Sequence, residues 1–112
     1  MIHILDEIVL AADDELKVLA LLESHYLPGL SSRPTLSLLN RWISPPVAVP
    51  GQPNTLWLLW QVESELGYYA MRGTAGAEVA EFWARIDAIC QSRHRHVLTD
   101  AGAALPRPLE AS

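Results

Sequence analysis

Three polar residues interrupt faces of predicted elements that are otherwise apolar. Asp6 shares a face of the predicted strand over 2–10 with Ile4 and Ile8, His25 ends a helical stripe, and Asn40 shares a face of the predicted strand over 35–43 with apolar residues. An ionised carboxylate is costly to bury, so Asp6 must be paired, protonated or placed beside a wet cavity. Beside a cavity, a carboxylate can act as a general acid or base.

Together these residues predict acid–base chemistry next to a substrate carbonyl. Asp6 would be the base, His25 the partner acid and Asn40 the donor to an oxyanion. Each has a structural alternative. Asp6 caps a strand end, or the register is off by one and Glu7 takes its role. His25 only complements a helix dipole, and Asn40 bonds a neighbouring strand.

Aromatic residues are expected to form the wall of the same site. An apolar pocket with a few polar groups is the usual site for a small molecule, and this one would take an apolar aromatic or polycyclic metabolite. Tyr69 is a second candidate for the oxyanion donor, and Arg72 could meet an anionic substrate group. The alternative is that the aromatics are core and Arg72 is a surface residue. The expected wall consists of Trp42, Trp60, Tyr69, Phe82 and Trp83.

Other chemistries have weaker support in the sequence. His94 and His96 share a face if their segment is a strand, but no third ligand accompanies them, so we expect no metal site. Cys90, the single cysteine, falls in an apolar helical stripe and is expected to be a small buried hydrophobe. One cysteine cannot form an internal disulfide, which favours the cytoplasm. The sequence contains no phosphate-binding loop and no dinucleotide fingerprint.

Composition limits the class of partner. The chain has 112 residues, of which 50% are hydrophobic and 19% charged, as in a small globular domain. Eight basic against 13 acidic residues give a net charge of −5, which argues against nucleic acid or an anionic membrane as partner. No apolar run approaches the roughly 20 residues of a membrane-spanning helix.

The order of predicted elements indicates a fold class. Strands are predicted over 2–10, 35–43 and 55–62, helices over 15–26 and 77–92, a short helix over 64–72, and a fourth strand over 94–99. This β-α-β-β-α-(β) order is typical of a ferredoxin-like α+β domain with an antiparallel sheet. We expect the domain to cover residues 1–99 and a flexible tail to cover 100–112.

Alternation sorts each predicted strand into two faces, because successive side chains point to opposite sides. The face expected to lie under the helices carries Ile2, Ile4, Asp6, Ile8 and Leu10, then Leu36, Leu38, Asn40 and Trp42, then Leu56, Leu58, Trp60 and Val62. The opposite face carries His3, Leu5 and Glu7, then Leu39, Arg41 and Ile43, then Trp57, Leu59 and Gln61. A bare sheet face on so small a domain is usually covered, and a second copy of the chain is the expected cover.

Three stretches carry a resemblance to a known superfamily. They are "DEIVL" at the end of the first strand, "LLWQVESELGYYAMR" from the third strand into the short helix, and "EFWARID" in the last helix. Over about residues 1–99 the chain resembles the dimeric α+β barrel superfamily, nearest its NIPSNAP-like and antibiotic-biosynthesis-monooxygenase-like groups. The segment "HYLPGL" is also similar to the ethyl tert-butyl ether degradation protein group.

The resemblance implies a homodimer in which two sheets face each other, and it implies several possible activities. Cofactor-free monooxygenases, haem-degrading enzymes, polyketide cyclases and lactone isomerases share this fold, as do members without known activity. The haem-degrading members use an asparagine, a tryptophan and a histidine where this chain has Asp6, Tyr69 and Phe82 or Trp83. We therefore expect a cofactor-independent isomerase, cyclase or lyase. The alternatives are a cofactor-free monooxygenase and a non-catalytic ligand-binding or assembly module.

Overall fold

A four-stranded antiparallel sheet forms one layer of the protein. The computed structural model describes residues 1–32, 36–63, 77–102 and 104–105. The strand order across the sheet is β2-β3-β1-β4, so the first and third strands lie at its centre. The strands are β1 (Ile2–Ala11), β2 (Leu36–Ser44), β3 (Pro53–Val62) and β4 (Ser92–Leu98).

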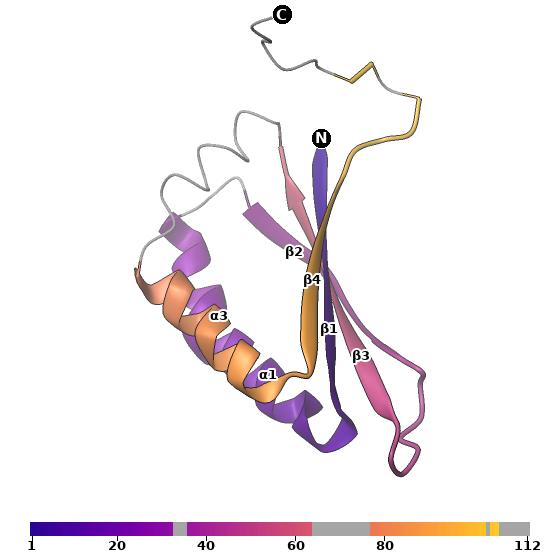
Figure 1. The fold of residues 1–112 in the computed structure, drawn as a ribbon. Helices are drawn as coiled ribbons and strands as arrows, with labels where there is room; N and C mark the ends of the chain where they lie inside the picture. The colour runs from indigo at the N-terminus through magenta and orange to yellow at the C-terminus, as the bar shows by residue number, and fades with distance from the viewer. Residues whose placement is uncertain (33–35, 64–76, 103, 106–112) are drawn as a thin grey trace, which may run out of the picture.

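The helices form a second layer on one side of the sheet (Figure 1). After β1 the chain makes a 3-10 turn, η1 (Ala12–Asp14), and enters α1 (Glu15–Leu21). That helix continues as a π-helix, η2 (Leu22–Tyr26), and then a 3-10 segment, η3 (Leu27–Ser32). The second long helix is α3 (Ala77–Ile89). Among the described elements, no helix lies on the opposite face of the sheet (Figure 1).

The core lies between these two layers because alternate strand residues point under the helices. Every second residue of β1 from Ile2 to Leu10 is buried, and β3 shows the same pattern from Asn54 to Val62. From the helices, Val18, Leu22, Tyr26, Phe82 and Ile86 complete the buried cluster. Burial of this apolar area is the main force that holds the helices against the sheet.

The structure confirms the predicted α+β, ferredoxin-like fold and the predicted order of elements. The weakly predicted fourth strand is present and pairs with β1. The predicted short helix over 64–72 lies outside the described residues, as does most of the predicted tail. Within the described ranges, no helix combines the length and apolar character needed to cross a membrane.

Candidate functional site

Asp6 lies in the middle of β1 and points under the helices, as its place in the alternation predicts. It is fully buried, at 0% exposure, between Ile4 and Ile8 on the same face. In the sheet it stands opposite Leu58 of β3 and Arg95 of β4. Glu7, the alternative to Asp6, points to the other face and is partly exposed.

Both carboxylate oxygens of Asp6 accept hydrogen bonds. Arg95 Nε donates to Oδ1 at 2.8 Å, and Arg95 Nη2 donates to Oδ2 at 3.0 Å. The indole N–H of Trp60 also donates to Oδ2, at 2.9 Å. A bidentate guanidinium and a third donor stabilise the ionised carboxylate in a position where its charge would otherwise be very unfavourable.

An aromatic cluster surrounds this pair on the helix side. The Tyr26 ring lies 5.2 Å from Trp60, 4.8 Å from Phe82 and 5.9 Å from Trp83, centroid to centroid. Phe82 and Trp83 of α3 are themselves 4.9 Å apart in an edge arrangement. Three of the five predicted wall residues, Trp60, Phe82 and Trp83, therefore belong to one aromatic cluster beside Asp6.

A second arginine–aspartate pair lies beside the first. The guanidinium carbons of Arg93 and Arg95 are 4.5 Å and 5.2 Å from the Trp83 ring centroid, within reach of cation–π attraction. Arg93 binds Asp87 of α3 through Nε at 2.7 Å and Nη2 at 3.1 Å. The hydrogen bond from Arg93 lowers the pKa of Asp87 below its ordinary value.

Cys90 lies next to this second pair and is partly buried. Burial raises the pKa of its thiol, and the nearby negative charge of Asp87 adds to the effect. A thiol with a raised pKa is a weak nucleophile at neutral pH, because the thiolate is the reactive form. This agrees with the expectation that Cys90 is a small hydrophobe that packs against the core.

His25 does not lie where the sequence predicts. It is exposed, and the next residue, Tyr26, points into the core instead. The physical reason is the π-helix over Leu22–Tyr26, whose wider turn rotates the chain and moves the inward position one residue along. The Nδ1 atom of His25 lies 2.6 Å from Ser24 Oγ, which in turn donates to the carbonyl of Ala20.

Asn40 and Trp42 are also on the opposite face from the one predicted. A β-bulge between Leu38 and Asn40 inserts one extra residue into β2, and this reverses the faces of the residues that follow. Asn40 is exposed and Trp42 is 49% exposed, whereas Ile43 packs against the core.

The bulge also explains the position of Arg41, which the sequence predicts on the bare face. Arg41 stands opposite the buried Leu58 and reaches Glu23 of the π-helix, with Nη1 2.8 Å from Oε1. The predicted trio of Asp6, His25 and Asn40 is thus not assembled around one point. Tyr69 and Arg72 lie outside the described residues.

Arg95 is the site residue that sequence reasoning missed. Its side chain is 33% exposed, so Arg95 is in contact with solvent while its guanidinium holds Asp6. The signal was present: in β4, Arg93, Arg95 and Val97 alternate with His94 and His96, so one strand face carries both arginines. What the sequence alone does not supply is the register that sets Arg95 against a residue 89 positions earlier.

The open face of the sheet combines an apolar centre with ionisable groups. On the β3 and β2 side, Trp57 stands opposite Trp42, and Leu59 stands opposite Asn40. On the β1 and β4 side, Glu7 stands opposite His94, and His96 Nε2 lies 3.1 Å from Glu7 Oε1. Among the described residues, no group of three or more His, Cys, Asp or Glu side chains is arranged to hold a metal ion.

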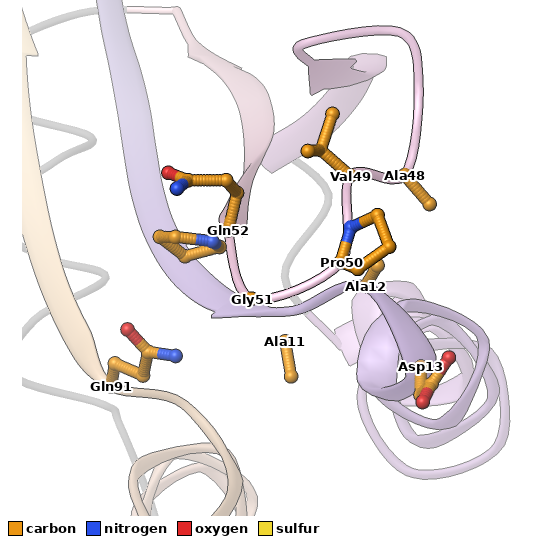
Figure 2. A pocket seen from close by; sticks show the side chains of 10 residues that line it. Ala11, Ala12, Asp13, Ala48, Val49, Pro50, Gly51, Gln52 and Gln91 are labelled. Atoms are coloured by element: carbon orange, nitrogen blue, oxygen red, sulfur yellow. The ribbon is translucent and has the colours of Figure 1, made fainter.

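A depression of about 580 Å³ lies at one end of the sheet (Figure 2). The loop between β2 and β3 forms one wall, with Val49 and Gly51, and the amides of Gln52 and Gln91 approach from the strand side (Figure 2). Asp13 is the ionisable residue in its lining. This depression contains none of the predicted site residues, and its amides can bind a polar ligand but offer no strong base.

No protein-family model matches the chain, and no curated protein matches it. Solved structures do match. A NIPSNAP domain protein from Burkholderia xenovorans superposes with a TM-score of 0.68 at 14% identity, over 95% of this chain and 100% of that chain. A NIPSNAP family protein of unknown function from Agrobacterium tumefaciens has a TM-score of 0.64 at 14% identity, over 88% of this chain and 86% of that one.

An antibiotic biosynthesis monooxygenase has a TM-score of 0.57 at 12% identity, over 95% of this chain and 100% of that chain. At these identities the likeness shows the fold. The chain therefore has the ferredoxin-like α+β fold of NIPSNAP domain proteins and antibiotic biosynthesis monooxygenases, as the resemblance in the sequence implied.

Proposed function

We propose that the protein is a homodimeric, cofactor-independent enzyme that moves a proton next to the carbonyl of an apolar, aromatic or polycyclic metabolite. The observation that carries this proposal is the fully buried Asp6, held by Arg95 and Trp60 within an aromatic cluster. Buried ion pairs rarely add stability compared with apolar residues of similar volume. A carboxylate in such a position therefore suggests a chemical role.

In this proposal, Asp6 removes a proton from the carbon beside the carbonyl. The C–H electron pair forms the enolate double bond, and the carbonyl electron pair moves onto oxygen. Arg95, which is accessible from solvent, moves from Asp6 to that oxygen and stabilises its negative charge. Return of the proton to a different carbon gives an isomer, so atoms and electrons balance without a further reactant.

Arg95 thus takes the oxyanion role for which the sequence suggested Asn40 or Tyr69. Trp60 keeps Oδ2 of Asp6 in place while Arg95 moves, because its indole N–H donates to the same oxygen. Trp83, which is only partly buried, supplies the apolar surface against which an aromatic substrate ring would pack, and the buried Phe82 supports it from behind. His25 is exposed and contacts Ser24 rather than Asp6, and it carries no step in the proposal.

A cofactor-free monooxygenase is the second candidate, and the fold shared with an antibiotic biosynthesis monooxygenase favours it. The first step is the same deprotonation by Asp6. The resulting electron-rich carbanion is then oxidised by dioxygen, so that a CH₂ group and O₂ give a carbonyl group and water. Oxygen uptake that accompanies turnover separates this reaction from an isomerisation.

The homodimer in this proposal forms through the open face of the sheet. Trp42 is 49% exposed and Leu98 is 43% exposed on that face, and Trp57, Leu5 and Leu59 are only half-covered. An apolar centre with polar groups around it is the usual composition of a protein interface. We further place the protein in the cytoplasm, because its single cysteine forms no internal disulfide.

The test uses 2-tetralone, a bicyclic aromatic ketone with acidic protons beside its carbonyl, in D₂O. Proton NMR follows the exchange of these protons for deuterium. The wild-type protein should accelerate the exchange above the buffer rate, and Asp6→Asn should return it to that rate. Asp87→Asn is the matched control, because it removes the neighbouring aspartate, whose pairing geometry is nearly the same, and it should exchange like wild type.

Equal exchange by wild type and Asp6→Asn would contradict the proposal. No acceleration by the wild-type protein, with this ketone or with a panel of aromatic ketones, would favour a non-catalytic binding or assembly module. The observation that favours such a module is that both Asp6 oxygens already accept hydrogen bonds from Arg95.

A further inference from the structure

Three histidines lie on the open face of the sheet, all on its β1 and β4 side. His94 and His96 come from β4, and His3 comes from β1, where Leu98 and Gln61 are its neighbours across the sheet. No other part of the described chain gathers three histidines, since His25 lies alone on the helical layer.

Glu7 is the acidic residue that faces them. It stands opposite His94 in the register and contacts His96, whose Nε2 is 3.1 Å from Glu7 Oε1. Strands β2 and β3 contribute no ionisable side chain to this face in the described residues. The other charged groups of the four strands point to the helix side and are paired there; they are Asp6 with Arg95, Arg41 with Glu23, and Arg93 with Asp87.

The charge of the open face therefore depends on the state of the histidines. With neutral imidazoles, the face carries the single negative charge of Glu7. With three imidazolium ions it carries a net charge of +2 per copy, because Glu7 compensates His96 and leaves His3 and His94 uncompensated. Among the described residues, the side chains of His3 and His94 have no hydrogen-bond or ion-pair partner, in contrast to that of His96. The ionisable groups just beyond these strands are the amino group of Met1, Glu63 directly after β3, and Asp100.

We propose that protons control the assembly of two copies through this face, so that the dimer forms when His3 and His94 are neutral and separates when they are charged. This inference rests on the homodimer of the proposed function. Two copies would bring a net charge of +4 into one interface, where water is excluded and charges repel more strongly than in solvent. The apolar centre formed by Trp42, Trp57 and Leu59 supplies the attraction that this repulsion opposes.

Histidine side chains ordinarily change charge near pH 6.5, so the pH range from 7.5 to 5.5 covers the transition. Each proton that must leave for the dimer to form changes its dissociation constant up to tenfold per pH unit. With two such histidines on each copy, we expect the dimer to bind at least tenfold more weakly at pH 5.5 than at pH 7.5.

Sedimentation velocity over a range of protein concentrations, in buffers with EDTA to exclude metal bridging, measures this dissociation constant. The decisive variant is His3→Gln/His94→Gln, which keeps the balanced Glu7–His96 pair and should show less than a twofold change across the same pH range. His25→Gln removes a histidine from the opposite layer and should keep the wild-type pH dependence. Circular dichroism at both pH values checks that each variant is folded.

The outcomes are distinct. A dimer whose dissociation constant is equal or lower at pH 5.5 overturns the proton control and leaves the homodimer intact. A His3→Gln/His94→Gln variant whose dimer remains as pH-dependent as that of wild type also overturns the proton control. A monomer at every pH and concentration overturns the homodimer itself, and the inference falls with it. The exchange of 2-tetralone protons at pH 7.5 then reports separately on the proposed chemistry.

Discussion

Two arginine–aspartate pairs lie side by side on this protein with nearly the same geometry and very different surroundings. In both, Nε and Nη2 of the arginine bind the two carboxylate oxygens, at 2.8 and 3.0 Å in Arg95–Asp6 and at 2.7 and 3.1 Å in Arg93–Asp87. Both arginines also lie over the Trp83 ring. Asp6, however, is fully buried, whereas the side chain of Asp87 is 52% exposed.

This difference in burial determines which of the two pairs can be removed with little loss of stability. Water solvates Asp87 when its partner is removed, so the exposed pair contributes little to stability. Water does not reach Asp6, so loss of its charge partner leaves a buried group without compensation. An apolar residue at position 6 would extend the alternation of β1 without that risk. We therefore infer that function, rather than stability, explains the aspartate at this position.

The largest effect is expected when one member of the buried pair is removed. Asp6→Asn leaves the Arg95 charge without its partner and should lower the free energy of unfolding by about 3 kcal/mol. The estimate stays at the low end because Arg95 is one-third exposed and can turn toward solvent. Asp87→Asn should cost less than about 1 kcal/mol. Urea unfolding followed by tryptophan fluorescence measures both, and equal costs would remove the distinction between the two pairs.

The second-largest loss of stability is expected at Trp83, whose ring lies beneath the arginines of both pairs. Trp83→Leu removes the edge contact with Phe82 and the surface beneath both guanidinium groups. We expect a loss of about 2 kcal/mol, mostly from packing, since a large aromatic side chain is replaced by a smaller one. Double-mutant cycles with Asp6→Asn and Asp87→Asn would show whether the ring supports both pairs. Strict additivity in both cycles would mean that it supports neither.

A smaller effect separates the two arginines. Lysine carries the charge but lacks the planar fork that binds both carboxylate oxygens. Arg95→Lys should cost about 1 kcal/mol, because one Asp6 oxygen loses its guanidinium donor in a buried position. Arg93→Lys should stay within about 0.5 kcal/mol of wild type, because water replaces the lost bond. A larger loss at Arg93 than at Arg95 would contradict this account.

The smallest expected effect is a pH dependence that belongs to the exposed pair. The hydrogen bond from Arg93 holds the pKa of Asp87 below its ordinary value, so Asp87 favours the folded state while it is ionised in both states. This contribution, about 0.5 kcal/mol, is complete above about pH 5 and is lost as pH falls through the lowered pKa of the folded state. The stability difference between wild type and Asp87→Asn should therefore shrink as the pH falls below about 4 and disappear once the pH is below the lowered pKa of Asp87. A difference in the free energy of unfolding that grows as the pH falls would contradict this prediction.

The sequence was sufficient to predict the elements and the position of Asp6, because both depend on local periodicity. The alternation in β1 is unbroken from Ile2 to Leu10, so its faces could be assigned with no knowledge of its neighbours. The helical stripes likewise predicted Phe82 on the buried side of α3.

The predictions that failed did so at two places where the chain departs from a regular period by one residue. The π-helix over Leu22–Tyr26 exchanges His25 for Tyr26 at the inward position, and the bulge before Asn40 exchanges the faces of Asn40 and Ile43. The bulge has no glycine or proline to mark it in the sequence, and the Pro28–Gly29 pair that follows the π-helix predicts the end of a helix rather than a wider turn. The Asp6–Arg95 pair was missed for another reason, because it depends on the register between β1 and β4.

The central claim is that the buried pair serves chemistry, and one double variant tests it most directly. Asp6→Asn/Arg95→Gln removes both charges, keeps similar shapes and leaves an amide oxygen that can accept from Trp60. Its unfolding free energy should lie within about 1 kcal/mol of wild type, because neutral groups replace an ion pair as a whole. Its exchange of 2-tetralone protons should fall to the buffer rate. A double variant that exchanges these protons as fast as wild type would contradict the claim.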